Sequence, residues 1–222
     1  IESIARDGKL LGPSDDVPYG GWMCSLNDWF TSEGADQYTI ANGRLAAGDV
    51  IRMEYSCNMG ADIGSVWGDS DTSLASLKIA GAGLSPAFSG AETAYTLVLE
   101  PGETAVTITY RATNRNFQAR AYKNSYAPTA ESWIKSGQTV SLSSGDVLYV
   151  GVGNSAWPSM NTGASETRYT LAVKSSAESL NERILALPTP EAATLKDKDE
   201  IQACQALYES LSAQEQAQIV QY

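Results

Sequence analysis

Hydrophobic and polar residues alternate in short runs through most of the first 174 residues. In two early runs, 22–26 and 51–57, apolar side chains occupy every second position. Asn27-Asp28 ends the first run, and Gly48-Asp49 precedes the second, so both are bounded by turn residues. A period of two is that of a strand with one buried face. We therefore predict two half-buried strands of a small sheet, with Trp22 in its core.

The segment 72–174 continues this strand pattern. About seven short runs alternate in the same way and are separated by turns rich in Gly, Pro, Ser and Asn. In the runs 95–99, 106–110 and 169–173, for example, every second residue is aliphatic or aromatic. About seven strands over about 100 residues are typical of a β-sandwich, which is the architecture we predict for this segment.

The spacing of apolar residues changes at Ser175, from every second residue to every third or fourth. Ser175, Asp197 and Ser212 each stand three residues before a glutamate, which is the capping-box pattern at a helix start. Pro188 ends the first apolar stripe. We predict three short helices over 175–222, which pack on the β region or continue into further sequence, because so short a helical segment is marginal alone.

The chain has a formal charge of −11 and contains no histidine. The acidic balance argues against nucleic acid and anionic membranes as partners, because both attract basic proteins. Without histidine there is no Ser-His-Asp or Cys-His nucleophile and no His-containing zinc site. Three cysteines are too few for an all-cysteine zinc site. A carboxylate pair or a lysine base remains as the alternative for an enzyme, because neither leaves a readable spacing signature. Our expectation is no catalytic residues, no metal and no cofactor.

No apolar run reaches the roughly 18 residues of a membrane-spanning helix, so we expect no membrane insertion by this segment. The first residue is Ile1 rather than methionine. We take the chain to be a piece of a longer protein.

The chain contains three cysteines, Cys24, Cys57 and Cys204. Cys24 and Cys57 share the parity of the apolar residues in their runs, which predicts that both point into one core. If the two strands are neighbours, a disulfide is geometrically possible and would suit an extracellular protein. Two buried free thiols are the alternative. Cys204 lies at helical spacing from Ile201 and Leu211 and is predicted to be a buried thiol.

One part of the β region reverses the acidic character of the chain. No Asp or Glu occurs between Glu103 and Glu131, and the basic residues there are accompanied by aromatic residues. Alternation predicts that Arg120 and Tyr122 face solvent, opposite Ala121. Exposed aromatic rings beside arginines bind sugars or protein partners, although an ordinary solvated face is the alternative. The candidate ligand-binding residues are Arg111, Arg115, Arg120, Tyr122, Trp133 and Trp157.

Several short motifs occur in order within residues 1–68. These are Gly21-Trp22-Met23 with Asn27, then Gly48-Asp49-Val50-Ile51 with Tyr55, and Gly60-Ala61-Asp62-Ile63-Gly64. On these residues the chain resembles a bacterial family of unknown function that is related to the C-terminal β-grasp domain of transcobalamin and gastric intrinsic factor. The resemblance implies a β-grasp-like unit that lacks an upstream strand and helix, and a corrinoid as an alternative ligand.

The next segment carries a second resemblance. Residues 74–79, 84–88 and 93–97 are similar to the opening of a bacterial cadherin-like β-sandwich, and 168–173 to its last strand. Cadherin's own calcium motifs do not occur, and Asp69-x-Asp71 is the remaining calcium candidate.

The C-terminal segment carries a third resemblance. Residues 185–188, 194–197 and 208–211 are similar to helical segments of large surface proteins from Gram-positive bacteria. All three resemblances imply an exported, modular protein at the bacterial cell surface or secreted from the cell.

These patterns and resemblances together predict a mainly β chain in three parts: a β-grasp-like unit over 1–70, an antiparallel cadherin-like β-sandwich over 72–174 and a helical segment over 175–222. The expected function is non-catalytic adhesion or binding of a glycan or of a host or bacterial surface protein. A module for a corrinoid or another small ligand and a structural spacer are the alternatives. A small-ligand module predicts a concave apolar pocket lined by tryptophan, whereas a spacer predicts none.

Overall fold

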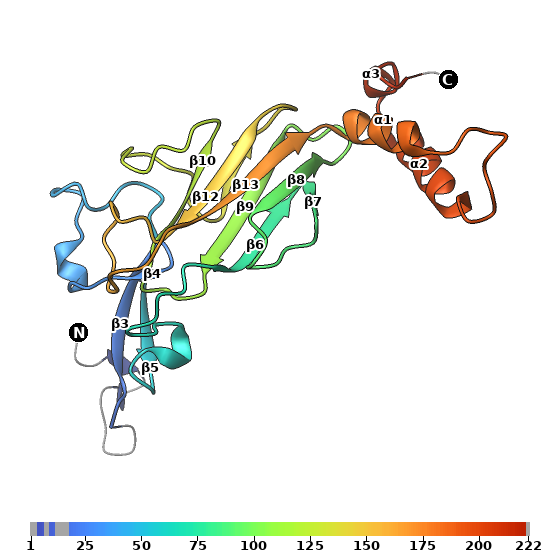
Figure 1. Cartoon of the computed structure of the whole chain (residues 1–222). Coiled ribbons are helices and arrows are strands. Elements are labelled where there is room, and N and C mark those ends of the chain that lie inside the picture. The colour runs from blue at the N-terminus through green and yellow to red at the C-terminus, as the bar shows by residue number, and fades with distance from the viewer. Residues whose placement is uncertain (1–3, 7–8, 12–17, 221–222) are drawn as a thin grey trace.

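The structure is a computed structural model that describes residues 4–6, 9–11 and 18–220 of the 222-residue chain. The described residues form mainly antiparallel β structure followed by three helices, which confirms the predicted mainly β class. Figure 1 shows an elongated arrangement, with the N-terminal strands at one end, the larger sheets in the middle and the helices at the other end.

The N-terminal part contains two small sheets. Their strands are β1 (Ile4–Arg6) paired with β2 (Lys9–Leu11), and β3 (Gly21–Leu26) placed between β4 (Trp29–Phe30) and β5 (Ile51–Ser56). All of these pairs are antiparallel. Asn27 and Asp28 join β3 to β4 with φ angles of 49° and 77°, as in the two-residue turns that suit a hairpin. The turn predicted at this position is confirmed.

The middle of the chain forms a five-stranded sheet and a three-stranded sheet. The five-stranded sheet has the order β10 (Ala119–Lys123), β12 (Val147–Val152), β13 (Thr167–Lys174), β8 (Ala94–Leu99) and β7 (Ala82–Ser85). The three-stranded sheet has the order β11 (Gln138–Ser141), β9 (Ala105–Ala112) and β6 (Leu74–Ala80). The pairing of β13 with β8 is parallel, and the other pairs are antiparallel.

Both of these sheets contribute side chains to one hydrophobic core. In β9, Val106, Ile108 and Tyr110 are buried and alternate with more exposed residues, as the sequence pattern predicted. Tyr169 of β13 is fully buried, and its hydroxyl accepts a hydrogen bond from the Leu74 amide and donates one to the Gly90 carbonyl. The alternation of apolar and polar residues therefore indicates which side of each strand faces the shared core.

The core role predicted for Trp22 is wrong. Trp22 is only half-buried and packs edge-to-face against Tyr55, with ring centroids 5.2 Å apart. Ile51, predicted to be buried on β5, is 42% exposed. The hydrophobic clusters of the described residues include no side chain of β3 or β5. Trp22, Met23 and Cys24 of β3 and Met53 of β5 instead border a cavity.

The disulfide considered between Cys24 and Cys57 does not form, because both are free thiols in the structure. The register of β3 and β5 places Cys24 opposite Met53, and Cys57 lies beyond the end of β5. Cys57 is exposed rather than buried in a core, so its predicted position is also wrong.

The C-terminal part contains α1 (Ser176–Ala186), α2 (Lys198–Ser210) and α3 (Ala213–Gln216). The capping boxes predicted at Ser175 and Ser212 are confirmed. The one predicted at Asp197 is wrong, because its carboxylate accepts hydrogen bonds from Thr194 instead, and the helix has no side-chain cap. None of the helices in the described ranges is long and apolar enough to cross a membrane.

The helices form a hydrophobic cluster of their own, separate from the β core. Cys204 lies in this cluster and is buried, as predicted. Several hydrogen bonds join the helices to the β region. The Ser176 hydroxyl donates to the Leu99 carbonyl and the Gly102 amide to the Glu215 carboxylate. The Ser144 hydroxyl also donates to the Glu178 carboxylate, and Lys174 Nζ to the Glu182 carboxylate.

Candidate functional site

Arg120 is stacked between two tryptophans on the outer face of β10. Its guanidinium carbon lies 3.8 Å from the ring centroid of Trp133 and 4.9 Å from that of Trp157. The Trp157 indole nitrogen donates to the Pro128 carbonyl at 2.7 Å, which joins the two loops that carry the rings. The structure thus brings together three of the six predicted site residues.

Gln118 orients the Arg120 guanidinium. Its side-chain oxygen accepts hydrogen bonds from Nε at 3.0 Å and from Nη2 at 2.8 Å. Its amide nitrogen in turn donates to the Pro158 carbonyl at 3.1 Å. Burial lowers the pKa of Arg120, which is opposed by interaction with Tyr122. Within the described ranges, no carboxylate forms an ion pair with Arg120.

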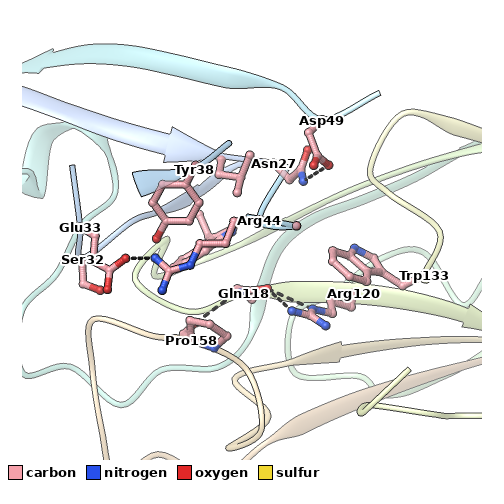
Figure 2. Close-up of a pocket in the computed structure, with 13 residues that line it drawn as sticks. Asn27, Ser32, Glu33, Tyr38, Arg44, Asp49, Gln118, Arg120, Trp133 and Pro158 are labelled. Atoms are coloured by element: carbon pink, nitrogen blue, oxygen red, sulfur yellow. Dashed lines mark hydrogen bonds and ion pairs between the residues drawn. The ribbon is translucent and has the colours of Figure 1, made fainter. Parts of the chain in front are cut away.

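The Arg120 side chain borders a cavity of about 290 Å³ between the N-terminal part and the five-stranded sheet. We call this cavity the Arg120 cleft. Figure 2 shows Tyr38 and Arg44 on one side of it, and Arg120 and Trp133 on the other. The lining residues are Leu26, Asn27, Trp29, Ser32, Glu33, Tyr38, Gly43, Arg44, Asp49, Gln118, Arg120, Trp133 and Pro158.

Each carboxylate that lines the Arg120 cleft already has a basic partner. Glu33 pairs with Arg44, and Asp49 pairs with Lys135. Burial alone would raise the pKa of Asp49, but hydrogen bonds from Lys135, Asn27 and the Ala46 amide outweigh that effect and lower it. Asp49 is therefore an ionised, fully engaged group that fixes the position of the Asn27 turn.

Aromatic rings form the apolar part of the N-terminal wall. Trp29 packs edge-to-face on Tyr38, with ring centroids 6.4 Å apart, and the Arg44 guanidinium carbon lies 5.7 Å from the Tyr38 ring centroid. Burial and the nearby Glu33 carboxylate raise the pKa of the Tyr38 hydroxyl. The hydroxyl therefore stays protonated at neutral pH and can both donate and accept hydrogen bonds.

The solvent exposure predicted for Tyr122 is wrong, although the strand face is as predicted. Arg120 and Tyr122 do lie opposite Ala121, which is fully buried in the core. However, Tyr122 is only 5% exposed, because Tyr126 covers it with ring centroids 5.2 Å apart. The loop after β10 folds back over the outer face of the sheet. Alternation identifies the face but not what covers it.

Arg115 and Arg111 lie apart from the Arg120 cleft. Arg115 is buried and donates to both Glu54 oxygens and to the carbonyls of Asp28 and Ile63, so it joins the N-terminal part to the β core. Arg111 is exposed and lines a separate small depression that also contains Asp62. The contacts of Arg115 thus account for its burial without a ligand. Arg111 does not contact the group formed by Arg120, Trp133 and Trp157.

A second cavity, of about 440 Å³, lies on the N-terminal part. Trp22 and Trp67 line it together with all four methionines of the chain, and Trp67 is 54% exposed. Methionine side chains are flexible and polarisable, and they adapt to apolar ligands of different shapes. The lining residues are Trp22, Met23, Cys24, Thr31, Glu33, Gly34, Ala35, Met53, Met59, Trp67 and Met160.

Sequence reasoning missed most of the N-terminal wall of the Arg120 cleft. Tyr38, Arg44 and Asp49 lie in irregular segments, where no periodicity shows which residues meet the sheet. Gln118 did carry a signal, because it stands two residues before Arg120. Residues at this spacing in an extended segment share a face.

Among the described residues, no group of His, Cys, Asp or Glu side chains is arranged to hold a metal ion. Asp69 and Asp71, the calcium candidates from the sequence, instead accept hydrogen bonds from the amides of Asp71 and Ser73 and so stabilise a turn. Comparisons of the chain with protein-family models, with curated proteins and with solved structures found no match.

Proposed function

We propose that this chain is a non-catalytic module of an exported bacterial surface protein and that it binds a glycan in the Arg120 cleft. The observation that carries the proposal is the composition of the cleft. Tyr38 and Trp133 supply aromatic surface, and the Tyr38 hydroxyl, the Asn27 amide and the Arg44 and Arg120 guanidinium groups supply hydrogen-bonding atoms on both walls. A sugar ring has apolar C–H faces that pack on aromatic rings, and hydroxyl groups that need hydrogen-bond partners.

The size of the Arg120 cleft favours a terminal sugar over a long oligosaccharide. Small-molecule sites usually occupy roughly 300–1,000 Å³, and this cavity, at about 290 Å³, lies just below the lower end of that range. The cleft walls are also held in place before a ligand arrives, by the Asp49 hydrogen bonds on one side and the Gln118–Arg120 hydrogen bonds on the other. Such preorganisation reduces the entropy lost on binding.

The interactions of the two cleft carboxylates, Glu33 and Asp49, favour a binding role over glycoside hydrolysis. A glycosidase needs one carboxyl group with a raised pKa to act as general acid. The pKa of Asp49 is instead lowered, and Glu33 is held by Arg44. Asp49 therefore lacks the environment of a proton donor, and Glu33 is engaged in its ion pair with Arg44, so the proposal assigns the cleft no catalytic residues.

The proposal also includes the β-sandwich and β-grasp-like assignments and the extracellular location that the sequence resemblances imply. The shared core of the five-stranded and three-stranded sheets supports a cadherin-like β-sandwich over 72–174. The small antiparallel β3–β4–β5 sheet supports a β-grasp-like unit over 1–70. On this proposal the partners are glycans or surface proteins outside the cell, and neither nucleic acid nor the membrane is among them.

The test is a titration of tryptophan fluorescence with a panel of free glycans on the whole chain. Saturable quenching that is lost in Trp133→Ala and kept in Trp67→Ala would support binding in the Arg120 cleft. Quenching that is lost only in Trp67→Ala would move the ligand to the second cavity. No response to any glycan, in titration and by calorimetry, would overturn the proposal.

The second cavity favours a different candidate function, the binding of a small apolar ligand. A small-ligand module is expected to have a concave pocket lined by tryptophan, and the Trp22–Trp67 cavity has this character. At about 440 Å³ it would hold only part of a ligand as large as a corrinoid. Titration with cobinamide and with a planar aromatic dye distinguishes these ligands, and loss of binding in Met53→Ser would support this site.

A further inference from the structure

We infer that the sugar bound in the Arg120 cleft carries a carboxylate, and that Arg120 is its counter-ion. This inference rests on the proposed function and names the class of ligand. Uronic acids and sialic acids are the sugars that carry such a group.

The charges around the Arg120 cleft do not cancel. The carboxylates of Glu33 and Asp49 are matched by Arg44 and Lys135. Arg120 then remains as a cation that has no carboxylate partner among the residues the structure describes. Counted with Lys135, which pairs with Asp49 but does not itself line the cleft, the group has one positive charge in excess, in a chain whose formal charge is −11.

Arg120 is held in a fixed orientation without being neutralised. The two tryptophan rings restrict the guanidinium plane, and Gln118, which is uncharged, accepts from Nε and Nη2. A planar guanidinium fixed in this way is suited to charge-assisted hydrogen bonds with a carboxylate. The ring contacts and Gln118 position the cation and leave its charge for a ligand.

Because Arg120 is half-buried, a negatively charged group on the ligand would stabilise its guanidinium. Burial disfavours a charged group, and this effect lowers the pKa of Arg120. A ligand carboxylate would restore the lost solvation as an ion pair, and in a partly buried site that pair is stronger than at the surface. Neutral sugars would offer only hydroxyl groups to the same guanidinium.

The overall negative charge of the chain does not oppose this assignment at short range. Charges separated by more than about 8 Å are largely screened at physiological salt. The part of the chain between Glu103 and Glu131 contains no acidic residue, and Arg120 lies within it. The field at the cleft is thus set by its own residues rather than by the net charge.

The experiment compares each acidic sugar with a neutral copy of the same shape. The probes are the methyl glycosides of glucuronic acid and of N-acetylneuraminic acid, each beside its carboxamide, titrated calorimetrically into the whole chain. A charged hydrogen bond contributes more than a neutral one, so we expect the acid to bind about ten- to hundredfold more tightly than the amide. Raising the salt concentration should reduce this difference.

The variants are Arg120→Gln, Arg120→Lys and the matched control Arg168→Gln. Arg168, on β13 of the same sheet, also stacks on an aromatic ring, with its guanidinium carbon 3.9 Å from the ring centroid of Tyr126 in the loop after β10, but it does not line the cleft. Arg120→Gln should remove the preference for the acid, Arg120→Lys should retain part of it, and Arg168→Gln should leave it unchanged. Circular dichroism and thermal unfolding verify that each variant is folded.

The outcomes separate this inference from the proposed function. Equal binding of acid and amide would overturn the inference while glycan binding stands. A preference for the acid that survives in folded Arg120→Gln would also overturn it, because another group would supply the charge. Failure of every acidic and neutral sugar to bind would overturn both proposals.

Discussion

Arg115 and Glu54 form a bidentate ion pair across the junction between the N-terminal part and the main β region, with Nη1–Oε1 and Nη2–Oε2 distances of 2.8 and 2.7 Å. The Arg115 guanidinium also lies over the Phe30 ring, 4.2 Å from its centroid. The side chain of Arg115 is 6% exposed and that of Glu54 is 26% exposed. This pair fixes the N-terminal wall of the Arg120 cleft relative to the sheet that forms the other wall.

Replacing Arg115 by methionine should destabilise the chain strongly. The change leaves the Glu54 carboxylate and two backbone carbonyls without their donor, and removing one partner of a buried ion pair costs about 3–5 kcal/mol. Urea unfolding followed by tryptophan fluorescence measures the loss. Arg52→Ala is the matched control, because Arg52 makes an exposed ion pair with Asp28, and it should change the unfolding free energy by less than about 1 kcal/mol. Equal effects of the two changes would contradict the role given to Arg115.

The hydrogen bonds of Asp146 predict a dependence of stability on pH. Hydrogen bonds from Lys123 and Asn124 lower the pKa of Asp146 from 3.8 to about 2. Because the folded-state pKa is depressed, this stabilisation is present above the unfolded value and is lost as the pH falls through about 2.

The stability difference between the wild-type chain and Asp146→Asn should therefore be constant near neutral pH and shrink on acidification below about 4. Urea unfolding at a series of pH values measures this difference. A difference that grows as the pH falls would show that the carboxylate is not stabilised in the folded state.

Gly151 provides a steric test of the loop that covers the sheet beside the Arg120 cleft. A Cβ atom at this position would lie 2.8 Å from Tyr126 Cζ and 3.0 Å from Glu166 Oε1. Gly151→Ala should displace Tyr126 and reduce the unfolding free energy by about 1–3 kcal/mol.

The matched control is Gly83→Ala in β7 of the same sheet. The nearest neighbour of its added Cβ is the Val98 carbonyl oxygen at 4.0 Å, which is ordinary contact. Gly83→Ala should be neutral or stabilising by about 0.4–1 kcal/mol. Thermal unfolding compares the two variants, and a stable Gly151→Ala protein would mean that Tyr126 does not pack on this strand.

The three cysteines should react with iodoacetamide in the order of their exposure. Cys57 is exposed, Cys24 is half-buried and Cys204 is buried, and burial raises the pKa of the Cys204 thiol. Because the thiolate is the reactive form, Cys204 should be modified only after unfolding. Peptide mass spectrometry after native labelling measures the order. A Cys24–Cys57 disulfide found before reduction would contradict the register of β3 and β5.

The regular elements were largely predictable from local patterns. The alternation in β9 and β13, the turn at Asn27-Asp28 and the capping boxes at Ser175 and Ser212 depend on residues that are near in sequence. Steric and hydrogen-bonding preferences of neighbouring residues act over the same short range. The sequence also placed Arg120, Trp133 and Trp157 in one candidate group, together with Arg111, Arg115 and Tyr122.

By itself, then, the sequence determined the mainly β class, the faces of the core strands and the caps of two helices. Only the tertiary structure decided that Trp22 borders a cavity, that Tyr122 is covered by Tyr126 and that Cys24 faces Met53 rather than Cys57. It also decided that segments around residues 27–49 and 118–133 form opposite walls of one cleft. The physical reason is that periodicity records which side of a strand is apolar, whereas the segment that packs on that side comes from a distant part of the chain.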